Sequence, residues 1–349
     1  MCVRPASAGW LGRLEMIRMD QPIEIRGVGN AKNPRIAITG ATGLLGRHVL
    51  EEIAVVPGSQ VLALVRPGSK WVPRTANVHL APVEFLTGES LPAALKSFQP
   101  TALIHCAATG MQPPRPAWAE LVRFNVDVSV RLCELAAQIP GCHMVHVSTG
   151  LAYRDEGRAL REEVPLESQH PYAATKIAAD VLVRSCAAEL HVPLTVLRPF
   201  SFSGPNDAGS RLFPSLLRAA AEKKRLDLSP GDQVRDHCAV SDIAHGIVLA
   251  VLKRDKLAPG TQIFNLGSGC TASLRKVIEG VVSELGLNVA LNFGARDRAP
   301  FEHKFLVADA TRARQLLGWQ PRTNFAYAVW LLARESCPSL QLLKPKQEL

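Results

Sequence analysis

The chain has 349 residues, of which 47% are hydrophobic and 20% charged, a composition that excludes a disordered chain and allows a sizeable buried core. Its net charge is +9, but the basic residues form no long runs with interleaved aromatic residues, so we expect no nucleic-acid partner. No apolar stretch is long enough to span a membrane and no cysteine pair has zinc-ligand spacing, so we expect a cytoplasmic protein with free thiols, no metal and no membrane partner.

Strand-like and helix-like segments alternate from residue 35 to residue 198, after an N-terminal extension (1–34) that shows no clear element. The expected strands are 35–39, 60–65, 78–85, 101–106, 142–148 and 194–198, and the main helices are 44–55, 118–138 and 172–190. This alternation is typical of βαβ units, and the continuously apolar strands suit a sheet covered on both faces. We therefore predict an α/β fold with a doubly wound parallel sheet over residues 35–198.

Beyond residue 198 the pattern becomes less regular and indicates a smaller C-terminal lobe. Segment 200–209 has the composition of a loop. The expected helices that follow are 212–222, 241–252, 273–285 and 310–317, and the expected strands are 226–228, 233–238, 262–266 and 289–293. We expect 199–330 to form mainly this lobe, 233–265 to return in part to the first domain, and 331–349 to be a tail.

A glycine-rich turn joins the first strand to the first helix. Glycines at 40, 43 and 46 allow a tight turn, a close approach of the backbone to a pyrophosphate, and close packing of the helix on the strand. The phosphates would then lie at a helix N-terminus, where free N–H groups favour negative charge. The candidate cofactor-binding residues of this turn are Gly40, Thr42, Gly43, Leu44, Leu45 and Gly46.

The residue that ends the second strand distinguishes NAD from NADP. An acidic residue at this position binds the ribose hydroxyl of NAD, whereas an arginine accommodates the 2′-phosphate of NADP. Arg66 follows strand 60–65, and no Asp or Glu competes with it there. We expect NADP, with NAD as the alternative and Arg47 as a second phosphate contact. A solvated loop position is the other interpretation of Arg66.

A tyrosine and a lysine four residues apart open helix 172–190. Tyr172 and Lys176 share one helix face, and a cation close to a phenol lowers the pKa of that phenol. Such a tyrosine can exchange a proton with a carbonyl or alcohol while a dinucleotide moves the hydride. Ser148 and Thr149 end strand 142–148, where a hydroxyl would face the ligand crevice. A surface Tyr–Lys pair and a turn-capping Ser148 are the alternatives.

With these residues the chain resembles the extended short-chain dehydrogenase/reductases, the NAD-dependent epimerase/dehydratase family, from about residue 35 to residue 319. The motifs that carry the resemblance are GATGLLG (40–46), HCAA (105–108), FNV (124–126), VSTGLAY (147–153), PYAATK (171–176), LRPFSFSGPND (197–207), GDQVRDHCAVSD (231–242), FNLGSG (264–269) and LGW (317–319). The resemblance implies a Rossmann domain, a nucleotide-sugar-binding lobe, and a homodimer formed through helices 118–138 and 172–190.

The resemblance also assigns individual residues. The catalytic residues would be Thr149, rather than Ser148, together with Tyr172 and Lys176. Further cofactor contacts would be Cys106, Ala107, Ala108, Asn125, Tyr172, Lys176 and Pro199. Substrate contacts would be Thr149, Ser201, Arg211, Leu212, Arg235 and Arg298, with Arg235 gripping the diphosphate of a nucleotide-sugar substrate.

Departures from the family pattern narrow the reaction. The dehydratases of the family carry Thr-Asp-Glu where this chain has Thr149-Gly150-Leu151, so a 4,6-dehydratase is not expected. The chain is similar to the CDP-abequose and CDP-paratose synthases in SRLFPSLL (210–217), GDQVRD (231–236), NFGA (292–295) and VADATRARQLLGW (307–319). This resemblance favours an NADPH-dependent 4-ketoreductase of a nucleotide-linked 4-keto-6-deoxyhexose. The alternatives are an NAD-dependent nucleotide-sugar 4-epimerase, a reductase of a non-sugar carbonyl, and a non-catalytic regulatory subunit.

Overall fold

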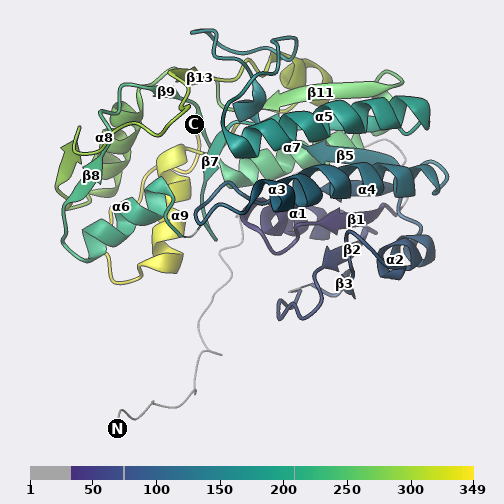
Figure 1. Ribbon diagram of the computed structural model, residues 1–349. Coiled ribbons are helices and arrows are strands. Elements are labelled where there is room, and N and C mark those ends of the chain that lie inside the picture. The colour runs from purple at the N-terminus through teal and green to yellow at the C-terminus, as the bar shows by residue number, and fades with distance from the viewer. Residues whose placement is uncertain (1–32, 74, 208) are drawn as a thin grey trace.

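The core of the protein is a parallel sheet, seen in a computed structural model that describes residues 33–349 except 74 and 208 (Figure 1). The seven strands have the spatial order β11-β6-β5-β4-β1-β2-β3, and all neighbours are parallel. They are β1 (Arg35–Thr39), β2 (Gln60–Val65), β3 (Val78–Pro82), β4 (Ala102–His105), β5 (His143–Val147), β6 (Leu194–Pro199) and β11 (Thr261–Leu266). The predicted α/β fold with a doubly wound sheet is confirmed.

The strand order reverses between β1 and β4, which are neighbours in the sheet. From β1 the chain continues to β2 and β3 on one side, and from β4 it continues to β5 and β6 on the other. Ile36 of β1 is in register with Val61 of β2 on one side and with Ala102 of β4 on the other. In an open α/β sheet, ligands bind beyond the carboxyl ends of the strands at such a reversal. The topology therefore places the glycine-rich turn, which follows β1, at the expected ligand crevice.

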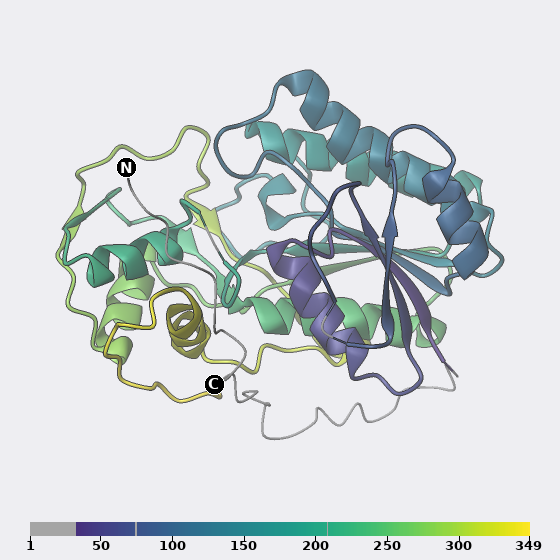
Figure 2. The same cartoon turned by 90° about the horizontal axis from the view of Figure 1, so that it is seen from below.

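Helices cover both faces of the sheet (Figure 2). On one face lie α1 (Leu44–Ala54) and α7 (Val240–Leu252), and on the other lie α2 (Ser90–Phe98), α3 (Trp118–Val122), α4 (Val128–Ala137) and α5 (Pro171–Glu189). Strand side chains alternate between the two layers, since Ile36 and Ile38 join the α1/α7 core while Ala37 joins the other. The two apolar cores fix the strand register, because a one-residue slip would exchange their side chains.

The helix predicted over 118–138 is a single helix interrupted by a wider turn. Between α3 and α4 lies the π-helical segment η1 (Arg123–Asp127), which contains Asn125. Such bulges redirect the side chains of one turn and occur frequently at functional sites.

The C-terminal lobe packs around its own apolar core, at the left of Figure 1. Its helices are α6 (Leu212–Ala221), α8 (Leu274–Leu285) and α9 (Phe325–Ser336), and its strands pair as β7 (Ser201–Ser203) with β10 (His237–Ala239), β8 (Leu226–Leu228) with β12 (Leu291–Phe293), and β9 (Val234–Arg235) with β13 (Phe305–Leu306). Short helical turns are η2 (Gly150–Ala152), η3 (Arg254–Lys256) and the π-helical η4 (Ala313–Leu317).

Several sequence-based boundaries differ from the structure. The expected loop 200–209 contains β7, and the expected strand 233–238 is two strands, β9 and β10, that pair with different partners. Helices α2 and α9 were not expected, and the boundary at residue 331 falls inside α9, whose Leu332 and Ala333 are buried in the lobe core. Within segment 233–265, helix α7 packs on the sheet, and strand β11 begins there and pairs with β6.

The N-terminal extension expected at 1–34 lies almost entirely outside the described residues. Within the part of the chain that is described, no helix combines the length and the apolar character needed to cross a bilayer. No group of three or more potential metal ligands occurs among those same residues.

Candidate active site

The glycine-rich turn leaves no room for side chains at its first and last glycines. Gly40 has φ +74°, and a Cβ there would lie 2.7 Å from the backbone nitrogen of Ala107 at the end of β4. A Cβ on Gly46 would lie 2.1 Å from the carbonyl oxygen of Gly40. The turn is therefore as tight as predicted, and α1 packs directly on the end of β1.

The N-terminus of α1 suits a phosphate. Its N-cap is Gly43, which has no side chain to cap the first turn, and the first turn contains no acidic residue. The N–H groups that begin a helix remain available in this situation and attract an anion together with the helix dipole. Thr42 and Gly43 are exposed, and Leu44 and Leu45 are partly exposed, so a ligand can reach this turn.

Arg66 is exposed at the end of β2, as a contact to a 2′-phosphate requires. Arg47 is engaged elsewhere: its Nη1 donates to Asn206 Oδ1 at 2.8 Å and its Nε to the Thr42 carbonyl at 3.0 Å. Arg47 thus links the glycine-rich turn to the loop after β7, which is a different contact from the one expected.

Asn125 is fully buried, and its side chain hydrogen-bonds to the backbone of the segment that follows β4. Its Oδ1 accepts from the Thr109 N–H at 2.8 Å, and its Nδ2 donates to the Thr109 carbonyl at 3.0 Å and to Thr175 Oγ1 at 2.9 Å. These contacts join the segment after β4 to α5, so Asn125 supports the position of both. The cofactor contact that the resemblance implies for Asn125 stays a prediction. Cys106 and Ala107 are partly exposed and Ala108 is exposed, whereas Pro199 is buried at the end of β6.

Tyr172 and Lys176 lie in the first turns of α5, which begins with Pro171 at the end of the sheet where the crevice opens. Burial raises the pKa of Tyr172 to about 12, and the cation that opposes this rise is Arg211, whereas helical spacing predicts Lys176. Burial lowers the pKa of Lys176 to about 8, and the carboxylate of Asp180 and the thiol of Cys106 oppose this change. The Lys176 side chain therefore extends toward the end of β4.

The two hydroxyls after β5 differ in their contacts. Thr149 caps η2, because its Oγ1 accepts from the Leu151 N–H at 3.2 Å. Ser148 Oγ is buried and has no hydrogen-bond partner among the described residues. Thr149 retains 7% exposure against 2% for Ser148, so it is the more accessible of the two to a substrate oxygen.

A cavity of about 170 Å³ lies between β7, α6, β9 and β10 in the C-terminal lobe. Four residues assigned to the substrate line it, namely Ser201, Arg211, Leu212 and Arg235. Its other lining residues are Phe202, Ser203, Asp207, Phe213, His237 and Leu274. Burial lowers the pKa of His237 to about 4, so this ring is neutral at physiological pH. A larger cleft of about 480 Å³ lies at the amino ends of β5, β6 and β11, away from the crevice and from Tyr172.

Two of the arginines expected to bind the substrate, Arg235 and Arg298, are paired with carboxylates. Arg235 Nη2 donates to Glu302 Oε1 at 2.9 Å and to the His303 carbonyl at 2.7 Å. Arg298, which does not line the cavity, forms an ion pair with Asp232. In this conformation the Arg235 guanidinium is bound to the Glu302 carboxylate, whereas the resemblance implies that it binds a diphosphate.

Three buried polar residues near α5 were missed by sequence reasoning: Tyr153, Asp180 and Arg198. Asp180 stands four residues after Lys176, a spacing that could have identified it as a neighbour on the same helix face. No local pattern links Tyr153 to Arg198, because their contact depends on the order of β5 and β6 in the sheet.

The family model described as "NAD dependent epimerase/dehydratase family" matches residues 36–267. The chain belongs to this family. A UDP-glucose 4-epimerase of Azospirillum brasilense is 27% identical over 315 residues, covering 84% of this chain and 88% of that protein. A dTDP-6-deoxy-L-talose 4-dehydrogenase (NAD(P)(+)) of Kitasatospora kifunensis is 28% identical over 320 residues, covering 84% and 93%.

Among solved structures, MoeE5 in complex with UDP-glucuronic acid and NAD is similar, with a TM-score of 0.77 and 24% identity. The match covers 88% of this chain and 100% of MoeE5. At this identity the likeness concerns the fold.

Proposed function

We propose that the protein is an NADPH-dependent reductase of the 4-keto group of a nucleotide-linked 4-keto-6-deoxyhexose. The observation that carries the proposal is that Tyr172 and Lys176 begin α5 and that Lys176 interacts with Cys106, in the segment against which Gly40 packs, in a chain of the epimerase/dehydratase family. The 4-dehydrogenase of K. kifunensis among its relatives supports chemistry at the same carbon.

The residues of the chain have separate tasks in this reaction. A bound nicotinamide dinucleotide would supply the hydride that adds to C4. Tyr172 donates its phenolic proton to the sugar O4 as that oxygen becomes an alkoxide, and its raised pKa means that the phenol is still protonated at neutral pH. Lys176 is a cation near this site and would hold the cofactor ribose, while Thr149 would donate a hydrogen bond to the same sugar oxygen.

Elimination of water is not part of the proposed reaction. A dehydratase needs an acid and a base beside the sugar in addition to the Tyr–Lys pair. Thr149 is followed by Gly150 and Leu151, which are neither. The cavity offers Arg211, Arg235 and the neutral His237 for the remainder of a nucleotide sugar.

A nucleotide-sugar 4-epimerase is the second candidate, and the relatives favour it. The UDP-glucose 4-epimerase of A. brasilense covers nearly the whole described chain. An epimerase would use the same Tyr172 and Lys176, with NAD retained between the two half-reactions. The exposed Arg66 at the end of β2 favours NADP and hence the reductase.

The decisive experiment measures NADPH absorbance with purified protein and a panel of nucleotide-linked 4-keto-6-deoxyhexoses. Oxidation of NADPH with one of them, abolished in Tyr172→Phe while NADPH binding is retained, is the expected result. Absence of oxidation with every member of the panel, together with interconversion of UDP-glucose and UDP-galactose, would replace the reductase by the epimerase.

The exposed apolar side chains of α3 and α5 support a homodimer. Trp118 and Val122 on α3 are 52% and 41% exposed, and Val181 and Leu182 on α5 are 48% and 47% exposed. Helices α3 and α5 are in contact, and both carry exposed apolar side chains. Burial of apolar surface between two copies would stabilise such a dimer.

A further inference from the structure

A buried carboxylate follows Lys176 by one turn of α5. Asp180 has no exposed surface, and it accepts a two-pronged contact from Arg198, whose Nε and Nη2 lie 3.1 and 3.0 Å from Oδ2. Arg184 Nε lies 2.8 Å from Oδ1. The planar guanidinium of Arg198 therefore fixes the rotation of this helical turn relative to β6.

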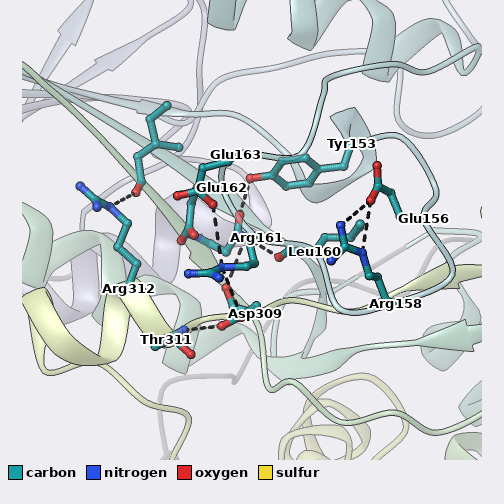
Figure 3. A network of polar contacts seen from close by, with 12 residues as sticks. Tyr153, Glu156, Arg158, Leu160, Arg161, Glu162, Glu163, Asp309, Thr311 and Arg312 are labelled. Carbon is teal, nitrogen blue, oxygen red and sulfur yellow. Dashed lines mark hydrogen bonds and ion pairs between the residues drawn. The ribbon is translucent and has the colours of Figure 1, made fainter.

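Arg198 extends the contact to Tyr153. Its Nη1 donates to the Tyr153 hydroxyl at 2.8 Å and to the Glu162 carbonyl at 3.2 Å. The Tyr153 hydroxyl in turn donates to Asn265 Oδ1 on β11 at 2.7 Å. Tyr153 has no exposed surface, and Figure 3 shows its ring directed toward the segment around Glu162.

Tyr153 is also tied to both sides of the site through its backbone. It directly follows η2, the short turn that Thr149 caps. Its carbonyl accepts from His303 Nε2 at 2.8 Å, and the His303 carbonyl accepts from Arg235, which lines the cavity. Tyr153 therefore contacts α5 indirectly through its hydroxyl, by way of Arg198, and is connected to η2 and to the cavity wall through its backbone.

We propose that Tyr153 is a positioning residue: its hydroxyl, held between Arg198 and Asn265, sets the position of the α5 turn with Lys176 and Tyr172 relative to Thr149. This rests on the proposed function of those three residues. Tyr153 acts through Arg198 and Asp180 and does not itself touch the reacting atoms.

We call Tyr153, Arg198, Asp180 and Asn265 the Tyr153 cluster. Its chemistry indicates that its main contribution is to position α5 and not to stabilise the fold. A buried ion pair loses much of its Coulomb attraction to the cost of removing two charges from water, so packed apolar residues are often as stabilising. The cluster instead defines the position of α5 relative to β6, because the Arg198 guanidinium can bond to Asp180 and to the Tyr153 hydroxyl only in one orientation. Displacement of a reacting group by about 1 Å can reduce a rate on the order of a hundredfold.

The test compares Tyr153→Phe with Tyr327→Phe, which removes a hydroxyl from a buried tyrosine on α9, outside the cluster. With the best nucleotide-linked substrate, we expect Tyr153→Phe to lower kcat at least about tenfold while KM and the Kd of the dinucleotide stay within twofold. Tyr327→Phe should leave kcat unchanged, and the Tm of each variant reports any loss of stability. Arg198→Lys keeps the charge without the fork, should lower kcat similarly, and serves as the test if Tyr153→Phe does not fold.

The outcomes separate the two proposals. A wild-type protein without turnover on any nucleotide-linked sugar would overturn the proposed function and the role of Tyr153 with it. An active wild type with a kcat for Tyr153→Phe within twofold, even at a lowered Tm, would overturn the role of Tyr153 alone.

Discussion

At the scale of single residues, burial changes the pKa values of the two main candidate residues, Tyr172 and Lys176, in opposite directions. Burial disfavours the charged form of each group, so it raises the pKa of Tyr172 and lowers the pKa of Lys176. Tyr172 consequently remains a phenol at neutral pH, which suits a proton donor. Lys176, by contrast, titrates close to the physiological range.

This difference predicts an alkaline limb in the pH profile of the proposed reductase. The pKa of Lys176 is about 8, so the lysine is a cation below this pH and loses its proton as the pH rises through it. We expect kcat to fall as the pH rises through about 8. Because Asp180 raises the pKa of Lys176, Asp180→Asn should move this limb to lower pH.

One of the other titratable groups around Lys176 provides a control variant for this experiment. Cys106, His105 and His146 also interact with it electrostatically, and Arg198 shares Asp180. Cys106→Ser keeps the size of the side chain and should shift the limb less than Asp180→Asn. A profile of kcat that is flat from pH 7 to pH 9, measured under saturating substrate, would contradict a role for the charge of Lys176.

Arg66 provides a second prediction at this scale. Arg66→Ala should raise the KM for NADPH at least about tenfold, the loss expected for one charge-assisted hydrogen bond to the 2′-phosphate. The KM for NADH should not change, since NADH lacks this phosphate, and it serves as the internal control. Equal KM values for NADPH before and after substitution would show that Arg66 is a solvated loop residue.

At the scale of elements, the junction of β1 with α1 is the most constrained part of the site. A Cβ on Gly46 would overlap the Gly40 carbonyl, so α1 could not keep its present distance from β1. Gly280 in α8 has no atom within 4 Å of the corresponding position. Alanine should therefore be poorly tolerated at Gly46 and well tolerated at Gly280, and the second substitution is the control for the first.

We expect Gly46→Ala to lower the Tm and to weaken dinucleotide binding at least about tenfold, because the α1 N-terminus must move away from the turn. Gly280→Ala should stabilise the protein by roughly 0.5–1 kcal/mol, the usual gain for alanine in a helix, with no effect on binding. Calorimetry and fluorescence titration with NADPH measure both effects. Unchanged dinucleotide affinity in Gly46→Ala would contradict the assignment of this turn.

At the scale of the whole molecule, the candidate site is divided between the sheet layers, which carry Tyr172 and Lys176, and the C-terminal lobe, which carries the cavity. The segment that carries Tyr172 lies on α5 of the sheet layers, whereas Arg211 and Arg235 belong to the lobe. Contacts such as Arg47 with Asn206 and His48 with the Pro205 carbonyl join the two parts. A substrate that bridges them would be held at both ends.

The proposed dimer is testable at this scale. Val181→Glu places a charge among the exposed apolar side chains of α5, so we expect it to convert a dimer to a monomer in light scattering after size exclusion. Val55→Glu is the control, since Val55 is 69% exposed at the end of α1, away from α3 and α5. A wild-type protein that elutes as a monomer would refute the dimer.

The sequence alone was sufficient to predict the parallel α/β sheet, the turn at Gly40–Gly46 and the position of Tyr172 and Lys176 on one helix. These features are local: a strand, its turn and the following helix are contiguous, and residues four apart share a helix face. It did not predict α9, whose buried side chains belong to a core that only forms with α6 and α8. It also predicted one strand over 233–238 where the structure has two, β9 and β10, because the two are separated by the different strands with which they pair.

The tertiary structure decided which polar groups are engaged. Arg235 pairs with Glu302, 67 positions away, and the Tyr153 hydroxyl bonds to Asn265, 112 positions away. Charge and residue type cannot distinguish a free arginine from a paired one, because the partner is brought close only by the order of strands and the packing of loops. For the same reason Asn125, part of a cofactor-like motif in sequence, became a buried link between Thr109 and Thr175.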